Sequence, residues 1–339
     1  MKKILVIRFS SIGDIVLTTP VIRCLKNQLK DIELHVLTKK KFSSLYKSNP
    51  YIDKVFEFDS SLKDNIKDLK TENYDYIVDL QKNKRSRRVT SSLALPHSSF
   101  PKLNLKKFLL TTFKINLMPD IHIVDRYFEA VKELGVNNDL QGLDFFISED
   151  NRFDVSILPI EFQKGFHAIV IGGTYKTKIL PAVKVIEVIK KLQEPVVLLG
   201  GPDDVERAEE ILSSINRVGS EQDRTMMAVS LAGKISLQKS ASVVEQAKSV
   251  LTNDTGLMHI AAAFHKNIIS VWGNTVPELG MYPYLPKEAE KCHIIECKSI
   301  KCRPCSKLGF KECPKRHFRC MMEIDTDAIV SKMKIDKND

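Results

Sequence analysis

Short apolar runs alternate with amphipathic stretches through most of the chain. A continuous apolar run closed by a polar residue is typical of a central strand in a parallel sheet, which is buried on both faces. The first half contains four such runs, at residues 3–8, 33–37, 53–58 and 76–80. Helical patterns are predicted at residues 15–29, where Pro20 starts or kinks the helix, and at residues 62–70 and 121–135. This alternation predicts an α/β domain built around a doubly wound parallel sheet.

The second half repeats the pattern. Its strand-like runs lie at residues 167–171, 195–199, 249–251 and 268–272. Its helical patterns lie at residues 181–192, 204–215 and 240–246, and a last helix is expected at residues 326–333. Less periodic residues around Pro159 mark a linker, so we expect domains at 1–158 and 159–325, followed by a C-terminal helix and tail at 326–339 that packs back on the body. The fold class is therefore two doubly wound domains with a cleft between them.

Charge and composition narrow the partners without choosing one. A net charge of +10 and a pI near 9.1 favour an acidic partner: nucleotide phosphates, nucleic acid or an anionic membrane surface. No apolar run reaches the ~18 residues of a membrane span, and Arg8 and Asp14 interrupt the first one. We therefore expect a cytoplasmic protein, whose seven cysteines are thiols or metal ligands rather than disulfides.

The stretch from Val250 to Ala263 predicts an anion site. It contains a strand end, the polar turn Asn253–Gly256 and then strong helix formers. Such a turn directs backbone N–H groups and the positive end of a helix dipole at one point, where phosphate is the usual guest. His259, one turn into the helix, is expected near the opening of this anion site. The alternatives are an ordinary capped βα turn and a histidine that only packs in its helix.

A basic cluster follows the strand that ends at Leu80. Its members are Lys82, Lys84, Arg85, Arg87 and Arg88. A solvated charged face is the simplest explanation, yet ligands of open α/β sheets bind beyond the carboxyl ends of strands. Arg85 and Arg88 lie three residues apart and would share one helix face, so these two are preferred as acceptor-binding residues.

Three motifs together resemble glycosyltransferase family 9, the heptosyltransferases of lipopolysaccharide core assembly. Residues 8–20, which include Ser10-Ser11-Ile12-Gly13-Asp14, resemble the opening of that family. Residues 232–237 and 252–263 are similar to its donor-side signature. The chain departs from the pattern at Ile179-Leu180, where the family has a basic residue and Trp before a proline.

The resemblance implies a GT-B fold, in which two Rossmann-like domains face a central cleft. The first domain would bind the acceptor, a lipopolysaccharide inner core, and the second an ADP-activated heptose. Transfer would invert the anomeric carbon with no cofactor for catalysis. The enzyme would work in the cytoplasm, peripherally at the inner face of the cytoplasmic membrane. A GT-B enzyme that uses another nucleotide sugar is the main alternative, and a nucleotide-binding protein without transferase activity is a weaker one.

The resemblance also assigns residues. Asp14 matches the catalytic base, which takes a proton from the acceptor hydroxyl, although a helix N-cap before Ile15 would explain it too. Ser10 and Ser11 would lie with Arg85 and Arg88 on the acceptor side. The expected donor-binding residues are Thr174, Lys178, Asp254, Thr255, Gly256 and His259. Lys178 matches a phosphate-binding lysine, a contact that Lys176 would be able to share.

Cys302, Cys305, Cys313 and Cys320 lie in one short basic segment. Their spacing suits a tetrahedral structural zinc site, with His317 as a substitute ligand, and free or redox-labile thiols are the alternative. Two other classes of protein fit less well. An NAD-dependent oxidoreductase would carry G-x-G-x-x-G after a strand, and a nucleic-acid-binding protein would interleave aromatic with basic residues, which residues 82–88 do not. Nucleic acid is therefore not an expected partner.

Overall fold

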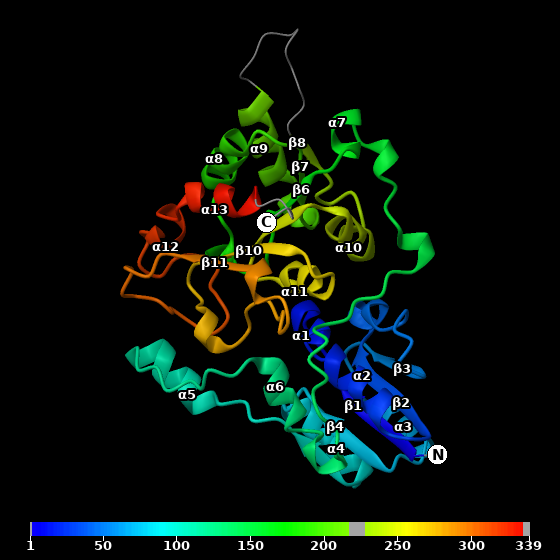
Figure 1. Cartoon of the computed structure of the whole chain (residues 1–339). Coiled ribbons are helices and arrows are strands. Elements are labelled where there is room, and N and C mark those ends of the chain that lie inside the picture. The colour runs from blue at the N-terminus through cyan, green and yellow to red at the C-terminus, as the bar shows by residue number, and fades with distance from the viewer. Residues whose placement is uncertain (1, 217–227, 335–339) are drawn as a thin grey trace. The chain divides into compact units, whose positions relative to one another are not determined.

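The computed structural model describes residues 2–216 and 228–334, which form two compact units (Figure 1). The first unit contains the chain up to Leu103 together with Asp120–Ser148. The second contains Asn104–Pro119 and the chain from Glu149 onward. The second unit therefore begins at 149 rather than at the expected 159, and it also takes in a segment that the sequence placed in the first domain. That segment joins it because Leu110 is buried against Val276 and Leu279.

The first unit is built on a five-stranded parallel sheet with the order β3-β2-β1-β4-β5. Its strands are β1 (Lys2–Ile7), β2 (Ile32–Lys39), β3 (Lys54–Phe58), β4 (Tyr76–Asp79) and β5 (His97–Ser99). The chain moves outward from β1 in one direction to β2 and β3, and then crosses back to β4 and β5 on the other side. The carboxyl ends of β1 and β4 therefore form a topological switch point, the usual ligand position in such sheets.

Helices cover both faces of this sheet. They are α1 (Ile12–Val16), α2 (Thr19–Gln28), α3 (Lys63–Thr71), α4 (Lys84–Leu93) and α6 (Ile123–Phe128), with 3-10 turns at Lys40–Leu45 and Lys132–Leu134. Leu69 of α3 and Val89 of α4 belong to the same buried core as Leu5 and Ile7 of β1. Helix α2 contacts β2 and α6. The sheet is doubly wound, as the sequence predicted.

Two predicted helices differ in the structure. The expected helix at 15–29 is two helices, because Pro20 lies in the first turn of α2, where its missing N–H costs no helical hydrogen bond. Asp14, expected in a loop, is the third residue of α1. The expected helix at 121–135 is shortened to α6, and the 3-10 turn after it ends at Gly135 with φ 75°.

The second unit has a six-stranded parallel sheet with the order β11-β10-β9-β6-β7-β8. Its strands are β6 (His167–Val170), β7 (Val196–Leu199), β8 (Ala228–Ser230), β9 (Ser249–Asn253), β10 (Asn267–Trp272) and β11 (Cys292–Glu296). Its switch point lies between β6 and β9. In register, Ile169 pairs with Leu198 and Leu251, so these side chains share one face and enter one core.

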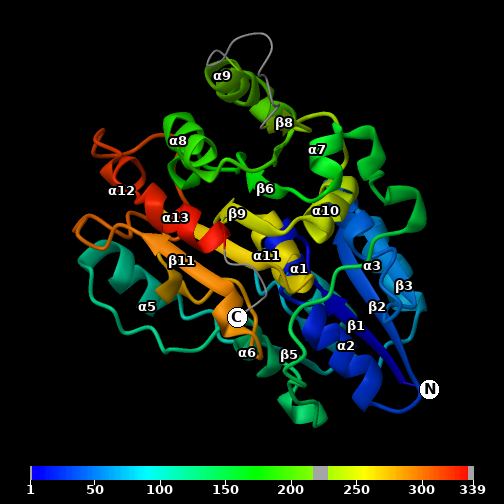
Figure 2. The same cartoon turned by 45° about the horizontal axis from the view of Figure 1, so that its top comes forward.

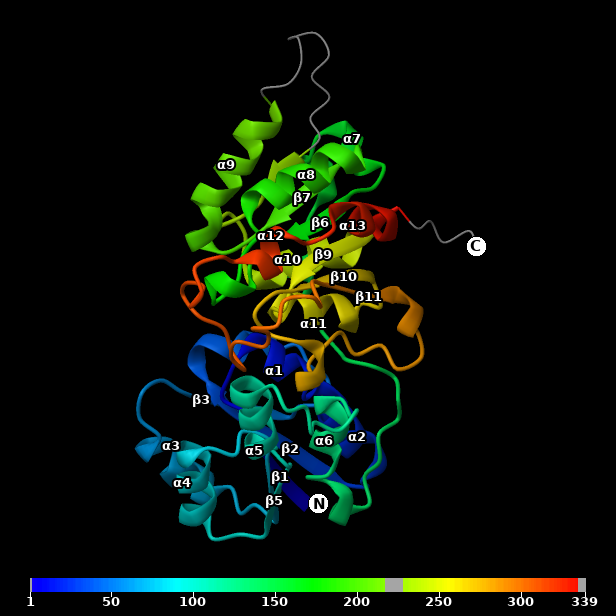
Figure 3. The same ribbon diagram turned by 90° about the vertical axis from the view of Figure 1, so that its left-hand side faces the viewer.

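Helices again cover both faces of the sheet. The unit contains α5 (Asn104–Phe108), a π-helical turn (Leu109–Phe113), α7 (Ile160–Gln163), α8 (Ala182–Leu192), α9 (Val205–Asn216), α10 (Leu237–Gln246), α11 (Gly256–Ala263), α12 (Arg319–Met322) and α13 (Thr326–Met333). Its 3-10 turns are Glu149–Asn151, Val155–Ile157, Lys176–Lys178, Pro202–Asp204, Pro277–Leu279 and Ala289–Lys291. The final helix α13 lies beside α8, which Figures 2 and 3 show from two sides, and its Ile329 and Met333 are buried in the core of that face. Helix α11 contacts β9, β10 and α10.

Among the described residues, no helix combines the length and apolar character needed to span a bilayer.

Candidate functional site

In the first unit, the loops after β1 and β4 are joined by hydrogen bonds at the switch point. The backbone N–H of Phe9 donates to Oε1 of Gln81 at 2.8 Å. The Arg8 guanidinium donates to the carbonyl oxygen of Leu80 at 2.5 Å. The two sequence features predicted to act here, the Ser-Ser-Ile-Gly-Asp stretch and the basic cluster, therefore start from adjacent strand ends.

Arg8 organises the loop that follows β1. Its buried guanidinium donates to the Ser10 carbonyl at 2.9 Å and to the Tyr127 hydroxyl at 3.1 Å, and its Nη2 lies 2.6 Å from Oδ1 of Asp14. Burial opposes the cation, yet the Asp14 carboxylate beside it leaves the pKa of Arg8 raised above its ordinary value. Arg8 therefore stays charged, and its ion pair with the carboxylate fixes the direction of the Asp14 side chain.

Asp14 is oriented from a second side by its own helix. Its Oδ2 accepts hydrogen bonds from the N–H of Ser11 at 3.1 Å and from the hydroxyl of Ser11 at 2.8 Å. Ser11, not Asp14, is the N-cap of α1. Asp14 is the third residue of the helix, and its carboxylate reaches back to the N-cap residue. About a quarter of the Asp14 side chain, 26%, is exposed to solvent. A fixed and partly exposed carboxylate is what a general base requires.

The basic cluster starts from a turn held by Asp79. This buried carboxylate accepts from the N–H groups of Gln81 and Lys82 at 2.9 and 2.7 Å, and from the hydroxyl of Ser86 at 2.7 Å. Asn83 then caps α4, with its Oδ1 accepting from the N–H groups of Arg85 and Ser86. The cluster therefore continues into a helix, α4, which was not predicted from the sequence as a separate element.

Arg85 and Arg88 are both exposed on α4. Within residues 2–216 and 228–334, neither side chain has a hydrogen-bond or ion-pair partner, whereas Lys82 donates to the Phe100 carbonyl at 2.9 Å. The two arginines are therefore available to an anionic ligand. Their acceptor role stays a prediction.

In the second unit, Asn253 ties together the two loops at the switch point. Its Nδ2 donates to the carbonyls of Val170 and Gly172 at 3.0 and 3.2 Å, and its Oδ1 accepts from the N–H of Leu180 at 2.9 Å. The side chain is buried. The sequence placed Asn253 only in a polar turn. The one indication of its wider role was that a polar residue stands at the end of a buried strand.

Lys178 and Asp254 meet at this switch point. Lys178 Nζ lies 2.6 Å from Asp254 Oδ2, which also accepts from the Thr275 hydroxyl at 2.9 Å. Both side chains of the pair are largely buried, at 15% and 13% exposure. The structure therefore brings together two of the expected donor residues. Lys176 occupies the same 3-10 turn, is exposed and has no side-chain partner among the described residues.

The start of α11 has the geometry of an anion site. Thr255 is the N-cap with an extended backbone, and its side chain makes no capping hydrogen bond with the helix. A methyl group on Gly173 would lie 3.3 Å from Cγ2 of Thr255, so glycine lets the loop after β6 approach the helix start closely. The first N–H groups, beginning with Gly256, are left for a ligand. Thr174 is exposed in the same loop.

His259 differs from its expected place. It is 2% exposed and lies among the buried residues of α11 rather than at an open mouth. The alternative of a packed helix histidine describes its position better than a direct ligand contact does.

The cysteine-rich segment holds the donor loop, a role that sequence reasoning missed. Thr177 donates from its N–H to the carbonyl of Phe310 at 3.2 Å, and its hydroxyl accepts from the Phe310 N–H at 2.8 Å. Gly309, with φ 126°, lies so close to Tyr175 that a Cβ would be 2.5 Å from it. The turn that carries Lys176 and Lys178 is therefore braced by residues more than 130 positions later in the chain.

Arg303 braces the other side of the ion pair. Its buried guanidinium donates to the carbonyls of Trp272 and Thr275 at 3.0 and 3.1 Å and pairs with Glu296 at 2.8 Å. Thr275 in turn donates to Asp254. No sequence signal separated Arg303 from the other basic residues near the cysteines.

The four candidate zinc ligands are close neighbours but not a closed set. Burial, with Cys302 beside it, raises the pKa of Cys305 to about 12, and burial raises that of Cys320 to about 11. Cys302 Sγ lies 3.7 Å from Nε2 of His317. No three of the described Cys and His ligand atoms here fall within 4.8 Å of one another. A tetrahedral site would need Cys302, Cys305, Cys313 and Cys320 drawn closer together, so structural zinc stays a prediction.

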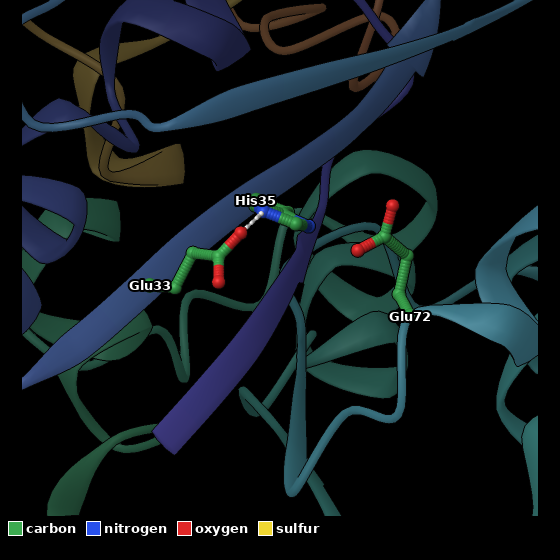
Figure 4. Close-up of side chains that lie close together, drawn as sticks. All are labelled: Glu33, His35 and Glu72. Carbon is green, nitrogen blue, oxygen red and sulfur yellow. Dashed lines mark hydrogen bonds and ion pairs between the residues drawn. The ribbon is translucent and has the colours of Figure 1, made fainter. Parts of the chain in front are cut away.

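One group in the described chain does have metal-like spacing: Glu33, His35 and Glu72 (Figure 4). It lies at the amino-terminal edge of the first sheet, opposite to the switch point. Lys3 lies 3.3 Å from Glu33 and 3.0 Å from Glu72, and Lys54 also pairs with Glu72. Because lysines already neutralise both carboxylates, this group is a structural ion-pair network.

Comparison with known proteins matches most of the chain to one family. The family model described as "Glycosyltransferase family 9 (heptosyltransferase)" matches residues 64–311, more than two thirds of the chain. The chain is 27% identical over 298 residues to lipopolysaccharide heptosyltransferase 1 of Campylobacter coli, covering 80% of this chain and 84% of that protein. It is 24% identical over 328 residues to lipooligosaccharide heptosyltransferase 2 of Haemophilus influenzae, covering 90% and 92%.

Solved structures show the same fold. The structure of ADP-heptose lipopolysaccharide heptosyltransferase II of E. coli superimposes with a TM-score of 0.72 at 20% identity, covering 98% of this chain and 97% of that one. A heptosyltransferase of E. coli with ADP gives a TM-score of 0.66 at 21% identity, covering 97% and 98%. The two helix-covered parallel sheets are thus those of the GT-B fold.

Proposed function

The chain belongs to glycosyltransferase family 9, and from this premise we propose that it transfers a heptose from an ADP-activated donor to a lipopolysaccharide inner-core acceptor. The observation that carries the proposal is Asp14, a carboxylate held by Arg8 and Ser11 at the switch point of the first sheet and still partly exposed. The relatives are named as heptosyltransferases of lipopolysaccharide or lipooligosaccharide, which supports this choice of sugar and acceptor.

In the reaction, Asp14 accepts the proton of the acceptor hydroxyl as the oxygen attacks the anomeric carbon. The bond from that carbon to the diphosphate oxygen breaks, and the configuration at the carbon inverts. ADP leaves with the electron pair of the broken bond, so its growing negative charge must be stabilised. No step of this sequence requires a cofactor.

The second unit supplies that stabilisation. The N–H groups at the start of α11, after Thr255 and from Gly256 on, donate to the phosphates. Lys178 adds a positive charge that Asp254 positions, and the unpaired Lys176 shares the phosphate contact. Thr174 lies exposed in the loop after β6. His259 contributes indirectly, because it is buried and packs α11 in place.

The acceptor is assigned to the first unit. Arg85 and Arg88 bind its acidic groups, for which the planar guanidinium is suited, while Ser10 and Ser11 lie beside the base. Because this acceptor is anchored in a lipid layer, the enzyme works from the cytoplasm, peripherally at the inner face of the membrane. The cysteine set, Cys302, Cys305, Cys313 and Cys320, is proposed to close around a structural zinc ion, which elemental analysis of protein purified without added metal would reveal.

The direct test is an assay of purified protein with ADP-heptose and truncated lipopolysaccharide acceptors, read by mass of the product and by release of ADP. We expect product with ADP-heptose and none with UDP-sugars, and a melting temperature raised by ADP but not by NAD or oligonucleotides. Transfer of a different sugar would contradict the donor, and stabilisation by NAD alone would contradict the enzyme class.

A further inference from the structure

Exposed apolar side chains are concentrated in residues 104–119. Five of the fifteen large apolar side chains that are exposed in the described chain lie in these sixteen residues, each at least half exposed. They are Leu105, Phe108, Phe113, Ile115 and Leu117, and Leu105 reaches 71%. Scattered apolar residues on a surface are ordinary, but a group confined to one segment marks an interaction site.

The segment is held in place rather than loose. Leu110 is buried with Val276 and Leu279, and Met118 packs against the same three-residue core. Lys114 donates to the carbonyl of Pro304 at 2.6 Å. Phe108 and Phe113 contact each other edge to face, with centroids 5.8 Å apart. The body of the second unit thus fixes the segment by one side, and Figure 1 shows α5, in teal, lying apart from the six-stranded sheet of its unit.

The charge of the segment selects the partner. Residues 104–119 contain three lysines, Lys106, Lys107 and Lys114, and no acidic residue. A second copy of the same surface would bring like charges together, which disfavours self-association. Aromatic and aliphatic side chains beside lysines are the composition of elements that lie in the interface of an anionic bilayer.

We propose that residues 104–119, the docking segment, attach the protein to the surface of an anionic lipid bilayer. Phe108, Phe113 and their apolar neighbours insert between the lipid headgroups, and Lys106 and Lys107 contact the lipid phosphates. The inference rests on the proposed function in one respect, since a membrane-anchored acceptor requires an enzyme that reaches the membrane. Beyond the proposed function, the inference names the surface that contacts the membrane and states that this surface prefers anionic lipid.

The test is co-sedimentation of the full chain with vesicles, either phosphatidylcholine alone or phosphatidylcholine mixed with phosphatidylglycerol. The variant Phe108→Ser with Phe113→Ser should lower the partition coefficient on mixed vesicles by roughly tenfold or more, because two rings no longer leave water. The matched control, Ile157→Ser with Ile160→Ser, removes two exposed apolar side chains outside the segment and should bind as the wild type does. Circular dichroism would verify that each variant is folded.

The charge is tested separately with Lys106→Gln and Lys107→Gln. The partition coefficient of this variant on mixed vesicles should fall by roughly fivefold or more, since each lysine near an anionic surface contributes attraction. Its partition coefficient on phosphatidylcholine alone should not change. Unchanged vesicle binding in both variants would overturn the proposal, as would a concentration-dependent dimer that the Phe variant abolishes. Transfer to a lipid-free core oligosaccharide should be unaffected, so failure of docking and failure of the transferase function give different results.

Discussion

The two switch points carry the same kind of pair with the charges reversed. In the first unit a buried arginine, Arg8, holds a partly exposed carboxylate, Asp14. In the second unit a carboxylate, Asp254, holds a lysine, Lys178, and both are largely buried. The exposed group of the first is therefore a carboxylate oxygen, which we propose accepts a proton. Around the second lie helix N–H groups and lysines, which we propose donate hydrogen bonds to a phosphate. Under the proposed function, one architecture, used twice, separates the base from the site of the leaving group.

The largest effect is expected from removing the base. Asp14→Asn keeps the size of the side chain and its contact with Ser11 but removes nearly all of its basicity. Turnover should fall by roughly 10²–10⁴-fold, the usual contribution of general acid–base catalysis. Ser11→Ala is the matched control, because it removes one hydrogen bond to the carboxylate and should cost far less. Turnover of Asp14→Asn within tenfold of the wild type would show that another group is the base.

The phosphate side should respond in binding rather than in proton transfer. Lys178→Ala should weaken ADP binding by roughly tenfold or more, at about 1.5–3 kcal/mol for a charged hydrogen bond. Lys176→Ala should have a smaller effect, since that lysine is exposed and screened. Lys190→Ala, which removes an exposed lysine of α8, is the control. If Lys176→Ala proves the more damaging change, the phosphate contact belongs to Lys176 and the pair with Asp254 is structural.

The acceptor side is tested by Arg85→Ala with Arg88→Ala. The acceptor KM should rise more than tenfold, at roughly 1.5–3 kcal/mol per charged hydrogen bond lost, with the donor KM unchanged. Arg87→Ala changes an exposed arginine between them on the same helix and is the matched control. A solvated charged face would leave the acceptor KM of both variants at the wild-type value.

The smallest expected effect lies at the opposite edge of the first sheet. Hydrogen bonds from Lys54 and Lys3 lower the pKa of Glu72 from 4.5 to about 2. A lowered carboxyl pKa stabilises the fold fully above pH 4.5, and this stability is lost as the pH falls toward 2. Glu72→Gln should therefore lower the melting temperature at pH 7 and match the wild type near pH 2. Glu133→Gln, an exposed carboxylate of the same unit, should show no such convergence.

The sequence predicted the parts of both sites that are local in the chain. The end of a buried strand followed by Asn253-Asp254-Thr255-Gly256 identified the start of α11, and the apolar run before Phe9 located β1. The helix at α1 was missed because its five residues carry too short a pattern. Strands β5 and β8 were missed for the same reason, with three residues each.

Contacts between distant segments were out of reach of local patterns. The brace of Thr177 by Phe310 joins positions 133 apart, and Arg303 supports Thr275 from within a run of similar basic residues. The burial of His259 was also unpredictable, because an α11 nearly apolar on every side gives no periodicity to tell its faces apart. Sequence patterns indicate which residue types lie at the strand ends. The fold determines which of those residues contact one another.

The division of labour between the two switch points has one direct test: the affinity of ADP for Asp14→Asn, measured by titration calorimetry beside Lys178→Ala. The account predicts that Asp14→Asn binds ADP within twofold of the wild type while its turnover collapses, and that Lys178→Ala loses affinity. Loss of ADP affinity in Asp14→Asn comparable to that in Lys178→Ala would contradict it.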